Sequence, residues 1–172
     1  MGYSHLLNTE VSLTNFRATY DVPEDLEVAY YYEGNIALKR RLQVMLFPLM
    51  AILKGRVRFP VDPLILRMLR FYRFSPDQLP PNFYRVVSCV KRLNQLYELQ
   101  LDHHDINFMY SLCGNIRTNY YLKVRDVWVR VISCLPDSNR NSTREYVRVS
   151  SNWHANKLTC PTSPRDVGWY RA

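Results

Sequence analysis

The sequence is poor in glycine, and its few cysteines are widely separated. Five glycines are scattered over 172 residues, so the chain has no glycine-rich loop of the kind that binds nucleotide phosphates. The four cysteines lie more than twenty residues apart. Without a Cys-x-x-Cys pair they indicate neither a zinc site nor a disulfide framework. These shortages exclude the common cofactor motifs, and we expect no cofactor and no small-molecule ligand.

Histidine is also scarce, with four in the chain, and His103 and His104 are the one adjacent pair. Neighbouring residues on a helix point about 100° apart, so we expect that these two do not share a metal ion. There is no Gly-x-Ser-x-Gly motif, and the candidate acids stand at expected helix starts and turns, where aspartate is ordinary. These acids are Asp102, Asp105, Asp126 and Asp137. We therefore predict no catalytic residue, no metal ligand and no enzyme.

Long apolar runs are absent as well. The longest, residues 44–53, has ten residues and contains Pro48, whereas a membrane-spanning helix needs about twenty. The first sixteen residues have neither a basic start nor an apolar stretch, which argues against a secretory signal. We expect an intracellular protein, in the cytoplasm or the nucleus, that does not contact a membrane.

Acidic and basic residues are concentrated in different parts of the chain. Residues 1–33 contain six acids and one base, whereas residues 39–92 contain twelve bases and two acids. The whole chain has a net charge of +8. This asymmetry predicts an anionic partner for the basic middle. That partner is RNA or DNA backbone, or an acidic segment of the same or a neighbouring chain.

The apolar pattern predicts an α+β protein in three parts. Residues 1–35 have no helical period and indicate a loosely structured acidic arm, with a short strand at 28–32. Residues 36–152 are expected to form a single α+β domain, and residues 153–172 a C-terminal tail. Within the domain we expect three to four helices over about 36–113, followed by a small antiparallel sheet over about 118–151.

Start and stop signals place the first two helices. One is expected over 36–53, with Pro48 either kinking it or starting a new helix. The Asp-Pro pair at 62–63 is a good helix start, with aspartate as the N-cap and proline in the first helical position. The Ser-Pro pair at 75–76 ends that helix.

Two further helices and the strands follow. A helix begins near 80–82, and its apolar stripe is Phe83, Val86, Val87, Val90 and Leu93. The next helix is capped by Asp102, with Asp105 three residues on. Its inner face is predicted to be Ile106, Met109, Tyr110 and Cys113. The segments 120–133 and 145–153 are rich in valine, tyrosine and tryptophan and predict strands.

The basic middle is the strongest functional signal. The candidate nucleic-acid-binding residues are Arg67, Arg70, Arg73, Arg85, Lys91 and Arg92. Arginine and lysine bind phosphates, and the aromatic residues at 71, 72 and 74 either stack on bases or belong to the core. The connector 75–81 has seven residues, three of them proline. It is too long for the turn of a DNA-reading helix-turn-helix, so we expect binding without sequence specificity.

Several runs carry a family resemblance. RFPVDPL, the connector SPDQLPPNFYR, the run LDHHDINFMYSL, and LPDSN followed by a Trp-His pair together resemble the gypsy-type transposon proteins of plants. The similarity covers roughly residues 46–164. It implies a retrotransposon-derived chain from the gag-proximal region. The activity of that family is unassigned, so no functional residue is carried over.

Three functional hypotheses remain. The first is a non-enzymatic structural or interaction module with weak, sequence-independent affinity for nucleic acid through the basic helical segment. The second is a protein–protein or self-association module without a nucleic-acid role, in which the acidic arm binds the basic middle. The third, an enzyme fragment, has no supporting motif.

Overall fold

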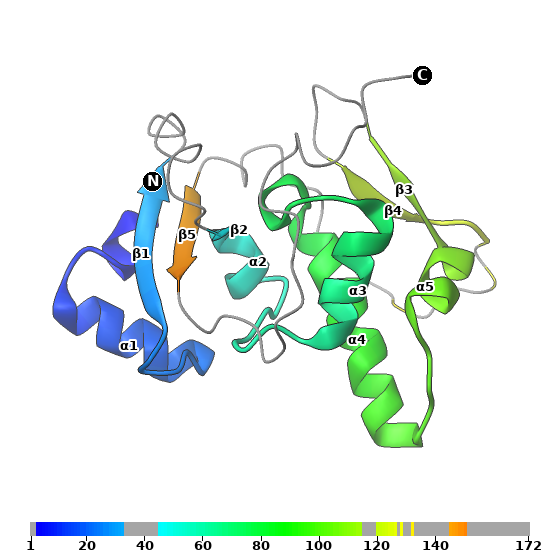
Figure 1. Ribbon diagram of the computed structural model, residues 1–172, viewed down its shortest axis with the longest axis horizontal. Helices are drawn as coiled ribbons and strands as arrows, with labels where there is room; N and C mark the ends of the chain where they lie inside the picture. The colour runs from blue at the N-terminus through cyan, green and yellow to red at the C-terminus, as the bar shows by residue number, and fades with distance from the viewer. Residues whose placement is uncertain are drawn as a thin grey trace.

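The computed structural model describes residues 3–32, 45–114, 120–126, 128, 132 and 145–150. In chain order its elements are η1 (Ser4–Leu6), α1 (Glu10–Tyr20), β1 (Glu27–Tyr32), β2 (Met45–Pro48), α2 (Leu49–Leu53), α3 (Pro63–Tyr72), η3 (Pro76–Gln78), α4 (Pro81–Tyr97), α5 (His103–Met109), β3 (Tyr110–Cys113), β4 (Tyr121–Val124) and β5 (Glu145–Ser150). The predicted α+β class is confirmed. α3 and α4 run through the middle, with β1, β5 and α1 on one side and α5, β3 and β4 on the other (Figure 1).

The larger sheet joins the two ends of the described chain. Its strand order is β1-β5-β2, and both pairings are antiparallel. Val147 of β5 lies opposite Tyr30 on one side and Phe47 on the other. Because β5 is the central strand, two segments more than a hundred residues apart form one continuous sheet.

The prediction of one small sheet over 118–151 is wrong in its pairing. β4 and β5 do form where strands were expected, but they belong to different sheets. β4 pairs with β3 in a two-stranded sheet, with Leu112 opposite Leu122. The partners of β5 come from residues 27–32 and 45–48, which the sequence reading assigned to the arm and to a helix.

The N-terminal segment is not a loosely structured arm over residues 10–32. Thr9 and Ser12 form a capping box at the start of α1, and the apolar residues Leu13, Phe16 and Tyr20 then follow at helical spacing. Phe16 is buried, as is Val28 on β1. The expected strand at 28–32 is confirmed as β1, and both elements contribute to the core.

The predicted helix over 36–53 is wrong for residues 45–48. They form β2, all four of them buried, and α2 begins only at Leu49. A short, wholly apolar run suits a buried strand as well as a helix, and the free edge of β5 supplies the strand partner. Residues 36–44 lie outside the described residues.

The central helices start where the sequence predicts. Asp62 Oδ1 accepts a hydrogen bond of 2.8 Å from the Leu64 N–H, and Pro63 is the first residue of α3. α4 begins at Pro81. Between them the Ser75–Gln78 capping box orders the connector, and the Tyr84 hydroxyl donates to the Pro76 carbonyl oxygen at 2.7 Å. This proline-rich connector therefore packs against α4.

α5 is capped as predicted but is shorter than predicted. Asp102 Oδ1 accepts hydrogen bonds from the backbone N–H groups of His104 and Asp105, while the Asp105 carboxylate accepts from the Asp102 N–H. The His104 N–H is the main reason that the pKa of Asp102 is lowered. Tyr110 adopts an extended conformation and starts β3. Tyr110 and Cys113 thus lie on a strand, because β4 offers that segment a partner.

No helix in the described part of the chain combines the length and the apolar character that a membrane crossing requires.

We predict that Gly55→Ala destabilises the fold. A methyl group at Gly55 would overlap the Ala51 carbonyl oxygen and lie 2.8 Å from Tyr84 Cβ, so α2 and α4 would have to separate. The expected loss is about 1–3 kcal/mol in the free energy of unfolding, measured by urea denaturation. Lys54→Ala, at the exposed neighbouring position, should change it by less than about 0.5 kcal/mol. Equal midpoints for the two variants would contradict this close approach.

The contact between Tyr30 and Glu145 gives a pH-dependent prediction. The Tyr30 hydroxyl donates to Glu145 Oε1 at 2.8 Å. Burial, then this hydrogen bond and the charge of Glu145, raise the pKa of Tyr30 to about 12. The unfolded chain therefore releases this proton first, so the contribution of Tyr30 is complete below about pH 10 and lost by about pH 12.

Tyr30→Phe should accordingly lower the free energy of unfolding at neutral pH by about 0.5–1.5 kcal/mol. The difference from the unaltered chain should shrink as the pH rises above 10, which urea denaturation at several pH values would measure. Tyr97→Phe, at an exposed position of α4, is the control. A difference that stays constant up to pH 12 would contradict the assignment.

Candidate nucleic-acid interface

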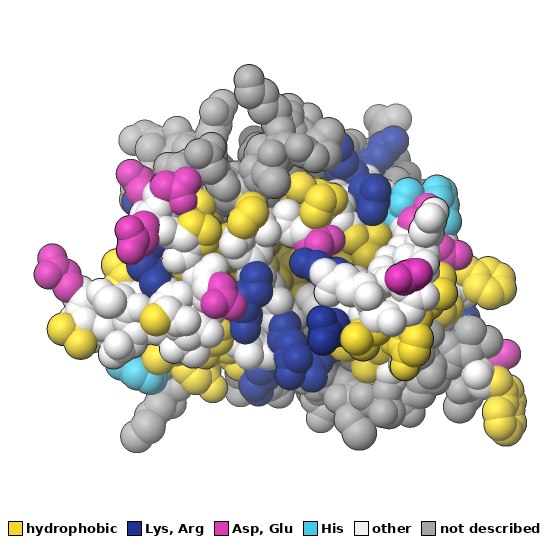
Figure 2. All heavy atoms as spheres, turned by 90° about the horizontal axis from the view of Figure 1, so that it is seen from below, with side chains coloured by type: hydrophobic (Ala, Val, Ile, Leu, Met, Phe, Trp, Pro, Cys, Tyr) yellow, Lys and Arg dark blue, Asp and Glu magenta, His cyan; other side chains and the backbone are white. Residues whose placement is uncertain are grey.

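The face seen from below in Figure 2 has a group of lysine and arginine side chains at its middle. Two shallow hollows lie between the loop that follows α2, the start of α3 and the second half of α4. The first, about 280 Å³, is lined by Arg56, Arg58, Lys91 and Arg92. The second, about 360 Å³, adds Arg67. We call these five cations the basic surface; Asp62 is the acid that lines both hollows.

The helical part of the basic surface follows from spacing on α4. Ser88, Lys91, Arg92 and Gln95 occur at i, i+3, i+4 and i+7, so they share one face of the helix and line the first hollow. Arg67 reaches the neighbouring hollow from α3. Because the cations come from two packed helices, their side chains face one shared patch of solvent.

The loop after α2 supplies the other two cations. Arg56 has a left-handed backbone (φ 60°) and an exposed side chain. Arg58 is held more tightly, because it donates to the Val57 carbonyl oxygen at 2.9 Å and lies 5.3 Å from the centre of the Tyr20 ring. Its Nε is also 3.6 Å from Asp21 Oδ2. The N-terminal segment thus contacts the basic surface directly.

The acid Asp62 has two functions at this site. One carboxylate oxygen caps α3 through the Leu64 N–H, and the other lies 2.9 Å from Lys91 Nζ. Lys91 is about half exposed, so this ion pair is worth little stability. Its larger effect is to neutralise one of the five cations.

The structure brings three of the six predicted nucleic-acid-binding residues together on the basic surface. Arg67, Lys91 and Arg92 line the two hollows, whereas Arg70, Arg73 and Arg85 line neither. Arg73 is the C-cap of α3, and both Arg70 and Arg73 are engaged in other interactions. Three-residue spacing on a helix moves successive side chains around its surface, which explains why the run does not form one patch.

Sequence reasoning missed Arg56 and Arg58. The available signal was the run KGRVRFP, in which cations follow the glycine at the end of α2. Their position beside α4 depends on how α2 packs against that helix, through contacts such as the 3.3 Å hydrogen bond from the Ser88 hydroxyl to the Gly55 carbonyl oxygen. Helical periodicity carries no information on such a loop.

The aromatic residues near the arginines do not line the basic surface. The Tyr72 hydroxyl donates to Asn107 Oδ1 at 3.0 Å, and burial raises the pKa of Tyr72. Phe74 packs on Tyr120 with ring centres 4.5 Å apart. The third ring, Phe71, lies against His103 and His104. The polar groups that line the two hollows are cations, amides, a serine hydroxyl and Asp62, set among aliphatic side chains, and the cations suit phosphates.

One further cluster of possible ligands lies outside the basic surface. The expectation that His103 and His104 point apart is wrong, because their ring centres are 4.1 Å apart. The 100° argument describes where Cβ atoms point, and rotation of the side chains brings the rings together again. Asp102 lies beside them.

Comparisons of the chain with protein-family models, with curated proteins and with solved structures find no match. The site is therefore interpreted from its own geometry.

We predict that Asp62→Asn increases affinity for a DNA oligonucleotide. Asparagine keeps an oxygen that can cap α3 but removes the charge that neutralises Lys91. Removing one unit charge near the surface should raise affinity about threefold to tenfold at low salt, as measured by fluorescence anisotropy. Asp77→Asn, which changes the net charge equally at the connector, should have little effect. Equal gains from both variants would mean that net charge alone is responsible.

Proposed function

We propose that this chain is a non-enzymatic, retrotransposon-derived structural or interaction protein that binds the backbone of RNA or DNA through its basic surface. The observation that carries the proposal is the convergence of five cations from three segments around two hollows, where the described residues place Asp62 beside Lys91 and Asp21 beside Arg58. The resemblance to gypsy-type transposon proteins agrees with this function but does not identify any of these residues.

The chemistry of the basic surface suits phosphates. Arginine offers a planar fork of N–H donors and lysine a mobile point charge. Ser88 and Gln95 add neutral hydrogen-bonding groups to the first hollow. Within the described residues the side chains of Arg56, Arg67 and Arg92 have no ion pair or hydrogen bond, so they can bind an anion without first losing a partner.

This arrangement favours affinity without sequence specificity. Contacts to phosphate position a protein on nucleic acid but do not read bases, and among the described residues no aromatic side chain lines either hollow. The five cations, with one of them neutralised by Asp62, can bind about four phosphates. The expected slope of log affinity against log salt concentration is then about −3. The proposal therefore requires weak binding that falls steeply as salt rises.

A second candidate function is self-association through acidic and basic segments. It is favoured by the contact of Asp21 and Tyr20 with Arg58, in which the acidic N-terminal segment already touches the basic surface. Deleting residues 1–33 is not a suitable test, because α1 and β1 contribute Phe16 and Val28 to the core. Asp21→Asn is a better one. A change in oligomeric state by light scattering would support this second function.

The decisive test compares two variants that alter net charge equally. Arg67→Gln with Arg92→Gln removes two charges from the basic surface, and Lys123→Glu changes the net charge by the same amount on β4. All three side chains are exposed, so we expect each variant to fold.

The double variant should bind RNA or DNA at least about tenfold more weakly at about 50 mM salt and reduce the salt slope by about 2. Lys123→Glu should leave the slope unchanged. The measurement is a salt titration by anisotropy. Undetectable binding by the unaltered chain, or equal losses in both variants, would contradict the proposed function.

A further inference from the structure

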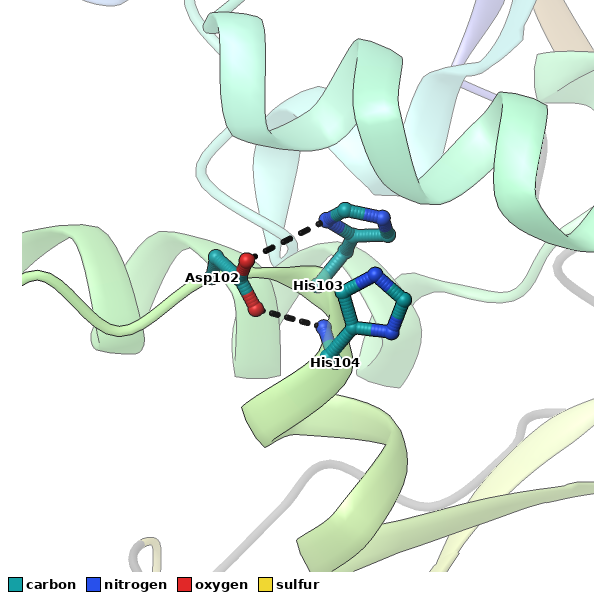
Figure 3. Close-up of side chains that lie close together, drawn as sticks. All are labelled: Asp102, His103 and His104. Atoms are coloured by element: carbon teal, nitrogen blue, oxygen red, sulfur yellow. Dashed lines mark hydrogen bonds and ion pairs between the residues drawn. The ribbon is translucent and has the colours of Figure 1, made fainter.

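Asp102, His103 and His104 form a compact group of metal-ligand types on the side of the molecule that carries α5. Each offers one ligand atom, and these atoms all lie within 4.8 Å of one another. Figure 3 shows the two imidazole rings side by side, with the carboxylate of Asp102 next to them. His103 Nδ1 is 3.8 Å from Asp102 Oδ2.

The three side chains are held in place by their surroundings. The backbone hydrogen bonds to Asp102, including one of 2.7 Å from the His104 N–H, all go to Oδ1. Oδ2 accepts neither of these backbone hydrogen bonds and faces His103 Nδ1. The Phe71 ring lies edge-on to both imidazoles, with ring centres 5.4 Å from His103 and 5.7 Å from His104. This packing restricts the half-buried His103, whereas the exposed His104 retains more freedom to turn.

One polar atom of the group lacks a partner. His103 Nδ1 is buried and has no hydrogen-bond partner among the described residues, since Asp102 Oδ2 at 3.8 Å is too distant for a hydrogen bond. Buried polar atoms are almost always paired in folded proteins, so an orphaned one requires an explanation. Imidazole nitrogens and carboxylate oxygens are both ligand atoms that zinc binds in proteins.

We propose that Asp102, His103 and His104 bind a divalent transition-metal ion of the zinc type. Two imidazole nitrogens and one carboxylate oxygen are donors that Zn²⁺, Co²⁺ and Ni²⁺ accept, whereas Ca²⁺ and Mg²⁺ prefer sites made of oxygen alone. His104 is exposed, so the remaining coordination positions face solvent. The site uses side chains only, and it is separate from the basic surface.

Binding requires a small adjustment of the group. Donors around a tetrahedral zinc ion at about 2.0–2.1 Å lie about 3.3 Å apart, whereas the present separations extend to 4.8 Å. Rotation of the exposed His104 ring can close this gap, because no hydrogen bond within the described residues holds that ring. Asp102 Oδ2 already lies 3.8 Å from His103 Nδ1.

The test is a titration of the full, untagged chain with zinc chloride, followed by isothermal calorimetry in the presence of a reductant that does not bind zinc. We expect one ion per chain. His104→Gln should lower the association constant at least tenfold, and Asp102→Asn, which keeps a capping oxygen, should also weaken binding. His5→Gln, at an exposed histidine near the N-terminus, should leave it unchanged.

Circular dichroism would verify that each variant is folded, and the same titration with Co²⁺ would report the ligands through its absorption spectrum. Nitrogen and oxygen ligation without a thiolate band supports the site. No saturable binding at millimolar zinc, or equal affinity in His104→Gln and the unaltered chain, overturns the proposal. A thiolate band would overturn it too, because the ion would then be bound by cysteine.

Discussion

The pairing of β5 with β1 and β2 is the constraint on which the rest of the structure depends. β5 has a neighbour on each side, and these neighbours come from the beginning of the chain. The sheet brings α1 beside the loop after α2, where Tyr20 and Asp21 contact Arg58. This long-range pairing adds to the packing of α2 on α4, and together they hold the loop that contributes two of the five cations. The basic surface therefore depends on a sheet that contributes no residue to it.

Charge on this surface is balanced by a few acids that also have structural functions. Asp62 caps α3 and pairs with Lys91, while Asp21 pairs with Arg58. Acidic residues placed in this way reduce repulsion among the cations without removing their collective field. The result is a surface suited to weak, salt-sensitive binding. Asp102 also has two functions, because one oxygen caps α5 and the other lies 3.8 Å from His103 Nδ1.

Local signals were sufficient for the helices whose ends carry strong caps. Asp62 with Pro63, Pro81, and Asp102 with Asp105 start α3, α4 and α5 as predicted, because an N-cap depends on atoms only a few residues away. The elements that the sequence did not predict, β2, β3 and α1, have a different physical origin. β2 and β3 are short segments that become strands because a partner strand is present. α1 is capped by Thr9, but its capping box has Ser12 at the third helical position, where glutamate or glutamine is usual.

The sequence by itself determined the fold class, the starts of the central helices and the basic character of residues 39–92. These properties depend on composition and on neighbours along the chain. Tertiary structure alone decided which cations share a surface, because Arg56 and Arg58 meet Lys91 and Arg92 only when α2 packs on α4. It also decided that His103 and His104 lie together, since the directions of side chains are set by packing against Phe71 rather than by helical spacing.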